Sequence, residues 1–244
     1  MLIMGVVAVL LIIVAVNQFS VPQGVGGHLS PAANIFVDYG NEIGLDEEQF
    51  REDMLSVRAL TALRDDMEQA VALGANYTPY LLLNGERIEN PASYEAFAEI
   101  IEEAIPQNAG PGAGQDGWSK GGGDDASVVI TKYSDFQCPA CQAYAPVLDI
   151  LIEEFGDDLR VVYKHLPLPQ HDHAQTAALA AEAAGMQGAF WQMHDLLFER
   201  QDHWAQGQAP TDTQTAGDIE EIEFDIDING DDGEAVELEI GDDE

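Results

Sequence analysis

The chain has 244 residues, of which 45 are acidic and nine are basic, so its formal net charge is −36. A charge this negative disfavours binding to nucleic acid and to anionic lipid surfaces, and we therefore expect no nucleic-acid partner. The length is enough for one domain of ordinary size with room for tails.

The acidic residues are spread along the chain as well as collected near its C-terminus, and only three of the nine basic residues are lysine. In concentrated salt, repulsion between such charges is screened within a few ångströms, whereas in dilute buffer it opposes a compact fold. We interpret the composition as that of a halophilic acidic protein.

Residues 1–18 predict a transmembrane signal anchor. The run from Met1 to Val16 is apolar apart from one glycine, and it is close to the lower limit for spanning a bilayer, where about 20 residues are usual. Val16-Asn-Gln-Phe-Ser20 is a poor cleavage site, so we favour an uncleaved anchor over a cleaved signal peptide. A buried helix is disfavoured because no polar face interrupts the run. Residues 19–29, which contain three glycines, are typical of a tether.

Residues 30–105 begin with helical periodicity and end with a hairpin signal. We expect helices over residues 34–43, 46–54 and 57–73, with Asp46 capping the second. Two short apolar runs then flank Asn84-Gly85, a dipeptide typical of a hairpin turn, and a last helix follows over residues 91–104. On the residues alone, Pro79 in Thr78-Pro79 is an ordinary trans proline that opens a strand.

Residues 106–125 are rich in glycine and have no periodicity, which is typical of a linker. Fully extended, about 20 residues reach roughly 60 Å. The segments on either side can therefore fold together within one chain.

Both cysteines of the chain stand in Tyr133-Ser-Asp-Phe-Gln-Cys138-Pro-Ala-Cys141-Gln. A predicted strand precedes them and a predicted helix follows, so Cys138 opens a helix, where free N–H groups and the helix dipole favour a thiolate. Pro139 is tolerated at a helix start, and the spacing lets Cys141 reach back to form a disulfide. The alternatives are half of a zinc site or two buried structural thiols; a structural zinc site needs four ligands, and no second pair exists.

The rest of the chain carries weaker signals. A strand is expected over residues 160–165. His165, His171 and His173 are set aside as metal ligands, because His171-Asp-His173 is more typical of a helix start with surface histidines. The acidic tail, residues 206–244, alternates apolar and acidic residues in two runs and is either a hairpin or disordered. Its Asp225-x-Asp227-x-Asn229 resembles the start of a calcium loop, but Val236 stands where that loop needs a glutamate. We expect no metal and no cofactor.

Four stretches resemble the first half of a DsbA-like thiol–disulfide oxidoreductase of the thioredoxin-like superfamily. They are Ser134-Asp-Phe-Gln-Cys-Pro-Ala-Cys141, Val161-Val-Tyr-Lys-His-Leu-Pro-Leu-Pro169, Ala177-Ala-Leu-Ala-Ala-Glu-Ala-Ala184 and Phe190-Trp-Gln-Met-His-Asp-Leu-Leu-Phe198. The features of the family's second half, insertion helices, a Thr-Pro turn, two short strands and a final helix, lie upstream in residues 30–105. The two halves therefore stand in reversed order.

The resemblance implies a role for each site residue. Cys138 would be the attacking, more exposed sulfur and Cys141 the resolving one. Pro79, preceded by Thr78, would be a cis proline that faces the cysteines and holds the substrate chain. Pro139 and Ala140 complete the active-site motif; strong oxidants of the family often carry histidine where Ala140 stands, so the direction of exchange stays open.

We therefore expect an α/β, thioredoxin-like fold with an inserted helical subdomain, circularly permuted, built from residues 30–105 and 126–205. A swapped dimer, in which each half completes another chain, is the competing arrangement.

The expected function is that of a membrane-anchored, extracytoplasmic thiol–disulfide oxidoreductase, because disulfides persist outside the cytoplasm. It would exchange disulfides with substrate proteins through Cys138 and Cys141 and be recycled by a redox partner. The alternative is a tethered polypeptide-binding module, a chaperone or adaptor, without redox turnover.

The halophile interpretation predicts a steep salt dependence of stability. The melting temperature, followed by circular dichroism, should rise strongly as KCl or NaCl is added, because counterions screen the repulsion among acidic side chains. A melting temperature that does not respond to salt would contradict this interpretation.

Overall fold

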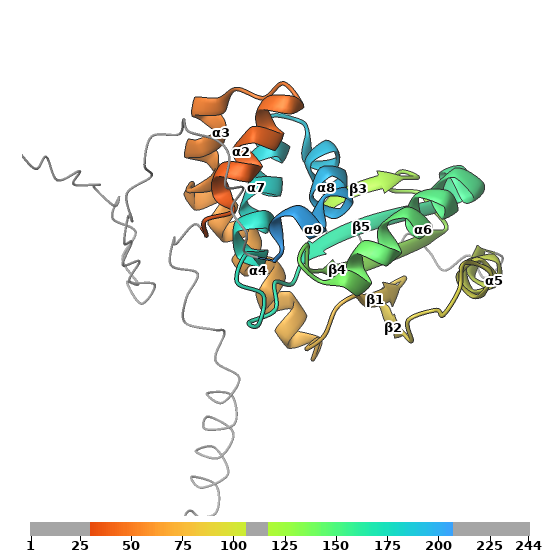
Figure 1. The fold of residues 1–244 in the computed structure, drawn as a ribbon. Helices are drawn as coiled ribbons and strands as arrows, with labels where there is room; N and C mark the ends of the chain where they lie inside the picture. The colour runs from red at the N-terminus through yellow and green to blue at the C-terminus, as the bar shows by residue number, and fades with distance from the viewer. Residues whose placement is uncertain (1–29, 106–116, 207–244) are drawn as a thin grey trace, which may run out of the picture.

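The computed structural model describes residues 30–105 and 117–206 (Figure 1). The first range forms α2 (Ala33–Glu42), α3 (Glu47–Met54), α4 (Val57–Ala72), β1 (Tyr80–Leu83), β2 (Glu86–Ile88) and α5 (Tyr94–Ala104). The second forms β3 (Trp118–Gly121), β4 (Val128–Ser134), α6 (Pro139–Phe155), a 3₁₀ turn (Gly156–Asp158), β5 (Leu159–His165), α7 (Ala174–Met186), α8 (Phe190–Glu199) and α9 (Gln201–Trp204).

The strands form one five-stranded mixed sheet in the order β2-β1-β4-β5-β3. The central strands β4 and β5 are parallel and are joined through α6, the expected crossover connection, while the other neighbours are antiparallel. Every residue of β4 is buried, as a β-branched and aromatic run between two neighbours and two layers should be. An α/β thioredoxin-like architecture follows from this sheet and its helices.

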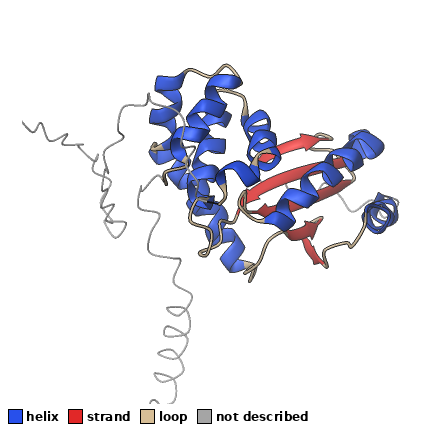
Figure 2. Cartoon of the chain, in the orientation of Figure 1, coloured by secondary structure: helices blue, strands red, loops and turns tan. Residues whose placement is uncertain are grey.

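The helices lie in two groups, one on a face of the sheet and one at its end (Figure 2). On one face, α5 and α6 bury a cluster of apolar side chains against the central strands. A larger cluster joins α2, α3, α7, α8 and α9 and reaches the sheet through Phe136 and Tyr163. The helical group is where the sequence predicted an inserted subdomain.

Local signals in the sequence explain several element boundaries. The Asp46 side chain accepts a hydrogen bond from the Gln49 N–H at 2.8 Å and caps α3, which confirms the predicted cap. The hairpin turn between β1 and β2 has positive φ at Asn84 (49°) and Gly85 (88°), a conformation that this dipeptide adopts readily.

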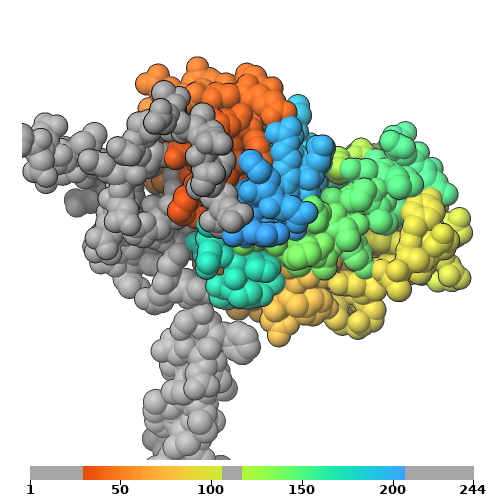
Figure 3. Space-filling view, in the orientation of Figure 1, coloured from red at the N-terminus to blue at the C-terminus, as the bar shows by residue number. Residues whose placement is uncertain are grey.

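Segments from the two described ranges lie directly against each other (Figure 3). Strand β1 pairs with β4 from Tyr80 opposite Tyr133 to Leu83 opposite Ile130. Farther along, the Asp66 carboxylate of α4 accepts hydrogen bonds from the Lys164 ammonium at 2.8 Å and from the His165 N–H at 2.9 Å. Both ranges therefore contribute to one sheet and one set of cores.

One strand lies inside the segment predicted to be a linker. Trp118–Gly121 forms β3 on the edge of the sheet, beside β5. The Trp118 indole stacks on Phe190 with ring centroids 4.7 Å apart and donates a hydrogen bond to Glu182 at 2.7 Å. A Cβ at Gly121 would lie 2.4 Å from the Leu159 carbonyl oxygen, so the strand needs glycine there. Glycine removes the alternating pattern by which a strand is predicted, and this explains the difference.

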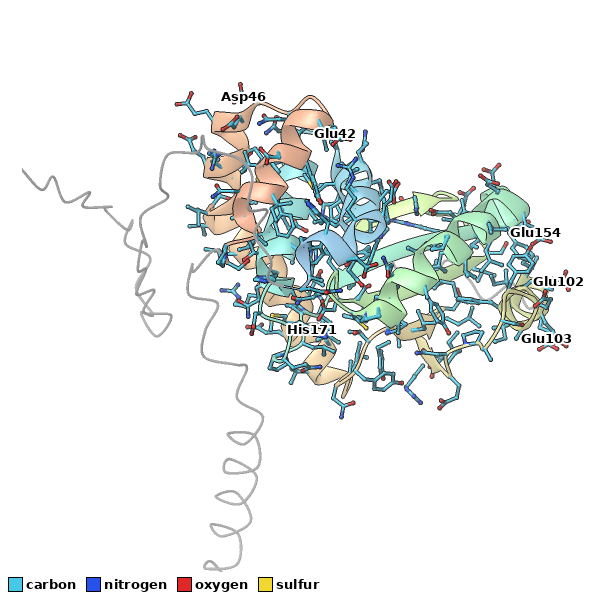
Figure 4. All side chains as sticks on the ribbon, viewed as in Figure 1. Glu42, Asp46, Glu102, Glu103, Glu154 and His171 are labelled. Carbon is cyan, nitrogen blue, oxygen red and sulfur yellow. The ribbon has the colours of Figure 1, made fainter. Side chains whose placement is uncertain are left out.

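Figure 4 shows Glu42, Asp46, Glu102 and Glu154 on the outside of the domain. Across residues 30–105 and 117–206, no helix has both the length and the apolar character needed to span a bilayer. The predicted anchor, residues 1–18, lies outside these ranges, and so does the tail beyond Gln206 with its predicted hairpin.

Candidate active site

Cys138 lies where the chain leaves β4 and enters α6. The turn is closed by a hydrogen bond of 3.1 Å from the Cys138 N–H to the Asp135 carbonyl, and the Asp135 carboxylate accepts the Gln137 N–H at 2.7 Å. Pro139 is the first residue of the helix, a position where its missing N–H has no partner to lose. The strand-to-helix placement of the cysteine pair is as the sequence predicts.

The two cysteines differ in exposure and in acidity. Both are free thiols; Cys138 is 7% exposed and Cys141 is fully buried. A hydrogen bond from the Cys141 thiol, aided by the backbone N–H groups of Cys141 and Ala140, lowers the pKa of Cys138 to about 5 against the opposing effect of burial. Burial and the same sulfur–sulfur bond raise the pKa of Cys141 well above its usual value. At neutral pH these shifts make Cys138 the thiolate of the pair and leave Cys141 a protonated thiol.

The Thr78-Pro79 bond is cis and lies against this pair. The Cys138 sulfur is 3.6 Å from the carbonyl oxygen of Thr78, although 60 residues separate them in the sequence. The Asn90 side chain donates to the Pro79 carbonyl at 2.8 Å and fixes the loop from its other side. The four residues predicted for catalysis and substrate binding thus meet at one place, while Pro139 and Ala140 are exposed beside them.

A second layer of polar contacts holds the turn before Cys138. The buried Asp135 carboxylate accepts hydrogen bonds from His171 Nδ1 at 2.6 Å and from the Leu168 N–H at 2.8 Å. Burial raises the pKa of Asp135 in spite of these bonds. Figure 4 labels His171 on the side of the domain where α6 begins. On the other side of the turn, the Gln201 amide donates to the Phe136 and Cys138 carbonyls at 2.6 and 3.1 Å.

The histidines do not converge on a common point. His165 contacts Glu182 at 2.9 Å, and His171 contacts Asp135 instead. Across residues 30–105 and 117–206, no three His, Cys, Asp or Glu side chains are placed to hold a metal ion. The contacts found here are those of structural side chains.

Sequence reasoning missed three residues that surround the pair: Lys132, Asp135 and Gln201. Lys132 had a visible signal, since it is the one charged residue of a fully buried strand. Asp135 and Gln201 had none, because their hydrogen bonds depend on turns and helix contacts that spacing does not reveal.

A mixed sheet, a cysteine pair at the start of the helix after its central strand, and a facing cis proline together define a thioredoxin-like domain of the DsbA-like kind. Such a site is consistent with thiol–disulfide oxidoreductase activity. In agreement, residues 29–103 and 119–238 match the family described as Thioredoxin, and the chain belongs to that family.

Curated relatives match part of the chain. "Na(+)/H(+) antiporter NhaA 1" of Salinispora arenicola is 50% identical over 78 residues, which are 32% of this chain and 12% of that protein. The protein of the same name from Mycolicibacterium vanbaalenii is 39% identical over 107 residues, 43% of this chain and 17% of that protein. "Na(+)/H(+) antiporter NhaA" of Herminiimonas arsenicoxydans is 45% identical over 80 residues, 33% of this chain and 13% of that protein. The chain thus covers less than a fifth of each of these relatives.

The thiol acidities predict how alkylation depends on pH. The rate at which iodoacetamide alkylates Cys138, followed by mass spectrometry, should titrate with a midpoint near pH 5, because the thiolate is the reactive form. In Cys141→Ala the midpoint should rise, since the largest cause of the low pKa is removed. In Cys138→Ala the buried Cys141 should be alkylated slowly throughout. A wild-type midpoint at the ordinary value of a cysteine would contradict the proposed thiolate.

Proposed function

We propose that the protein is a membrane-anchored, extracytoplasmic thiol–disulfide oxidoreductase that exchanges disulfides with substrate proteins through Cys138 and Cys141. The observation that supports this most strongly is the 3.6 Å approach of the Cys138 sulfur to the carbonyl of Thr78, beside cis Pro79. An acidic sulfur next to the backbone of a loop can bind an extended polypeptide and react with its cysteine in one place.

The proposed exchange has two steps in each direction. In the reducing direction, the Cys138 thiolate attacks one sulfur of a client disulfide, the client S–S bond breaks, and the other client sulfur leaves as a thiolate. Cys141 then loses its proton to solvent and attacks Cys138, which releases the second client sulfur and leaves the pair as a disulfide. Two electrons pass from the cysteine pair to the client.

The oxidising direction is the reverse and is the one that the acidity of Cys138 supports. A client thiolate attacks Cys138 of the oxidised pair, Cys141 leaves and takes up a proton, and a second client thiolate displaces Cys138. Because Cys138 is a stable thiolate near neutral pH, it is a good leaving group and the reduced pair is favoured. We therefore propose oxidation of client thiols as the main reaction, with a redox partner that removes the electrons.

We further propose that the domain is a circular permutant. Residues 30–105 would supply the second half of the DsbA-like fold and residues 126–205 the first half, joined by residues 106–125. Support comes from the pairing of β1 with β4 and from the Cys138–Thr78 contact, both made within a single chain. The family match in two segments is compatible with this order.

The membrane location rests on residues 1–18 and on the relatives. The relatives are named Na+/H+ antiporters, and antiport takes place across a membrane. Since this chain covers less than a fifth of those proteins, we propose a membrane association for it and no transport.

A binding module without turnover is the second candidate function. It is favoured by the side chains of Leu73 and Tyr77, which are 41% and 36% exposed close to the Thr78-Pro79 loop. Apolar side chains beside a free backbone edge can hold an unfolded polypeptide without any reaction of the cysteines.

An insulin-reduction and thiol-oxidation assay separates these two functions. The wild-type protein should turn over, Cys138→Ser should have no detectable activity, and Cys141→Ser should accumulate a mixed disulfide with the client that appears on a non-reducing gel. A wild-type protein that binds unfolded polypeptide with unchanged affinity in Cys138→Ser, and that shows no turnover to lose, would favour the binding module instead.

Light scattering tests the permutation. Residues 30–205, produced without the anchor and tail, should be monomeric at low concentration and keep the reactivity of Cys138, because each chain holds both halves of the site. A species that stays strictly dimeric on dilution would contradict the monomeric permutant and favour a swapped dimer.

A further inference from the structure

Lys132 is a buried lysine in the middle of β4, the strand that leads to the cysteine pair. Its side chain is 1% exposed, and its ammonium donates a hydrogen bond of 3.2 Å to the main-chain carbonyl of Cys141. It also lies 4.9 Å from the centre of the Phe198 ring, whose face attracts a cation. Within residues 30–105 and 117–206, no carboxylate lies within 4.0 Å of this ammonium.

The other buried lysine near the sheet is paired differently. Lys164 is equally buried, but its ammonium contacts the Asp66 carboxylate at 2.8 Å. A buried ammonium without such a partner is unfavourable, and burial lowers the pKa of Lys132 to about 8. Lys132 therefore carries a buried positive charge that no neighbouring carboxylate within the described residues neutralises.

The groups around Lys132 identify what its charge acts on. A small cavity beside it is lined from the other strands and helices, by Lys120, Ala145, Leu148, Val161, Tyr163, Trp191 and His194. Lys120 of β3 is paired with Asp149 of α6, and on α8 burial lowers the pKa of His194 to about 4, so His194 is neutral beside Asp195. Burial also keeps Tyr163 of β5 neutral, because its pKa is raised well above the usual value.

The acidic groups that act on Lys132 are Cys141, Asp149 and Cys138, and Asp149 is already paired with Lys120. Cys141 has the strongest favourable electrostatic interaction with this ammonium, ahead of Asp149 and Cys138. The interaction acts in both directions: Lys132 lowers the pKa of Cys141 against the larger effects of burial and of the bond to Cys138. Both side chains are buried, so the charges are weakly screened.

We propose that Lys132 is a positioning residue that stabilises the thiolate of Cys141 in the second step of the exchange. This inference rests on the proposed function. In the mixed disulfide, the Cys138 sulfur is bonded to the client and no longer a thiolate, so Cys141 becomes the one sulfur of the pair able to carry negative charge. Cys141 gives its proton to solvent, its thiolate attacks Cys138, a new S–S bond forms, and the client sulfur leaves with the electron pair of the broken bond.

The hydrogen bond to the Cys141 carbonyl adds an orienting role. It joins the first turn of α6 to the centre of the sheet, and it holds the ammonium against the main chain of the residue whose charge it supports. Lys132 is expected to act mainly on the second step, because its interaction with Cys141 is larger than that with Cys138, and Cys138 has its own stabilising bonds from Cys141 and Ala140.

A disulfide reagent that releases a coloured thiolate at each step tests this role. With 5,5′-dithiobis(2-nitrobenzoate) in excess, reduced wild-type protein should release one equivalent as Cys138 attacks and a second as Cys141 closes the disulfide. In Lys132→Met the first release should stay within about twofold, and the second should slow by about tenfold or more, one pKa unit of Cys141 being a factor of ten. The second release should also require a higher pH.

Controls separate charge from packing. Lys132→Arg keeps the charge and should restore most of the second rate, whereas Lys132→Gln keeps a donor without charge and should stay slow. Leu148→Met changes the wall of the same cavity and should leave both rates near wild type. Circular dichroism checks folding; if Lys132→Met does not fold, Lys132→Gln gives the same comparison.

Two outcomes overturn different claims. Equal slowing of both releases in Lys132→Met and Lys132→Gln, or an unchanged second release, would overturn the role of Lys132 and leave the exchange reaction intact. A wild-type protein that releases one equivalent and forms no disulfide would overturn the proposed function itself.

Discussion

The site depends on the pairing of β1 with β4. Strand β1 has four residues, and its antiparallel register with β4 fixes where the residues just before it lie. A shift of one residue would turn Leu81, which is fully buried, to the opposite face of the sheet, so the register is strongly determined. In this register the Thr78-Pro79 bond ends beside the helix start at Cys138, and two distant parts of the chain form one reaction site.

The placement of positive charge follows a consistent pattern. The chain has three lysines, and all three side chains are largely inside the fold. Lys120 is 21% exposed, Lys132 is 1% exposed and Lys164 is 4% exposed. Arginines supply the more exposed cations, such as Arg200, which pairs with Glu42 across the two halves of the chain. Lys132 and Lys164 thus act on groups inside the fold, whereas the strongly acidic surface is left to water and salt.

The interior charges differ in what they contribute. At Asp66 the cost of burial exceeds the help from Lys164 and His165, and the pKa of this carboxyl is raised. Such a pair adds little net stability, yet removing one partner leaves the other unpaired in a medium of low dielectric constant. We interpret the Asp66–Lys164 contact as one that fixes how α4 lies against β5. It thereby helps to fix how residues 30–105 pack against residues 117–206.

The sequence was enough to predict the parts of the site that local chemistry determines. The cysteine pair at a strand–helix junction, the Asp46 cap and the Asn84-Gly85 turn all follow from residues within a few positions of each other. It was not enough for β3, a four-residue strand in a glycine-rich segment, or for the Asp135–His171 bond, which depends on the loop after β5 folding back. Pro79 was predicted correctly, but not from local chemistry. Its cis bond is unusual for X-Pro and was expected through the family resemblance alone.

The acidity of Cys138 also links the redox state of the pair to the stability of the fold. The pKa of Cys138 is about 5 in the folded protein and lies near its ordinary value of 9 in the unfolded chain. The thiolate therefore contributes a stabilisation that is fully present above about pH 9 and is lost as the pH falls through 5. Cys141 contributes no pH-dependent stability below pH 9, because its thiol is protonated in both the folded and the unfolded state.

The oxidised pair has no thiolate and lacks this contribution to stability. Raising the pH from 5 therefore favours the reduced fold over the oxidised one, and this linkage is the physical argument behind the proposed oxidation of client thiols.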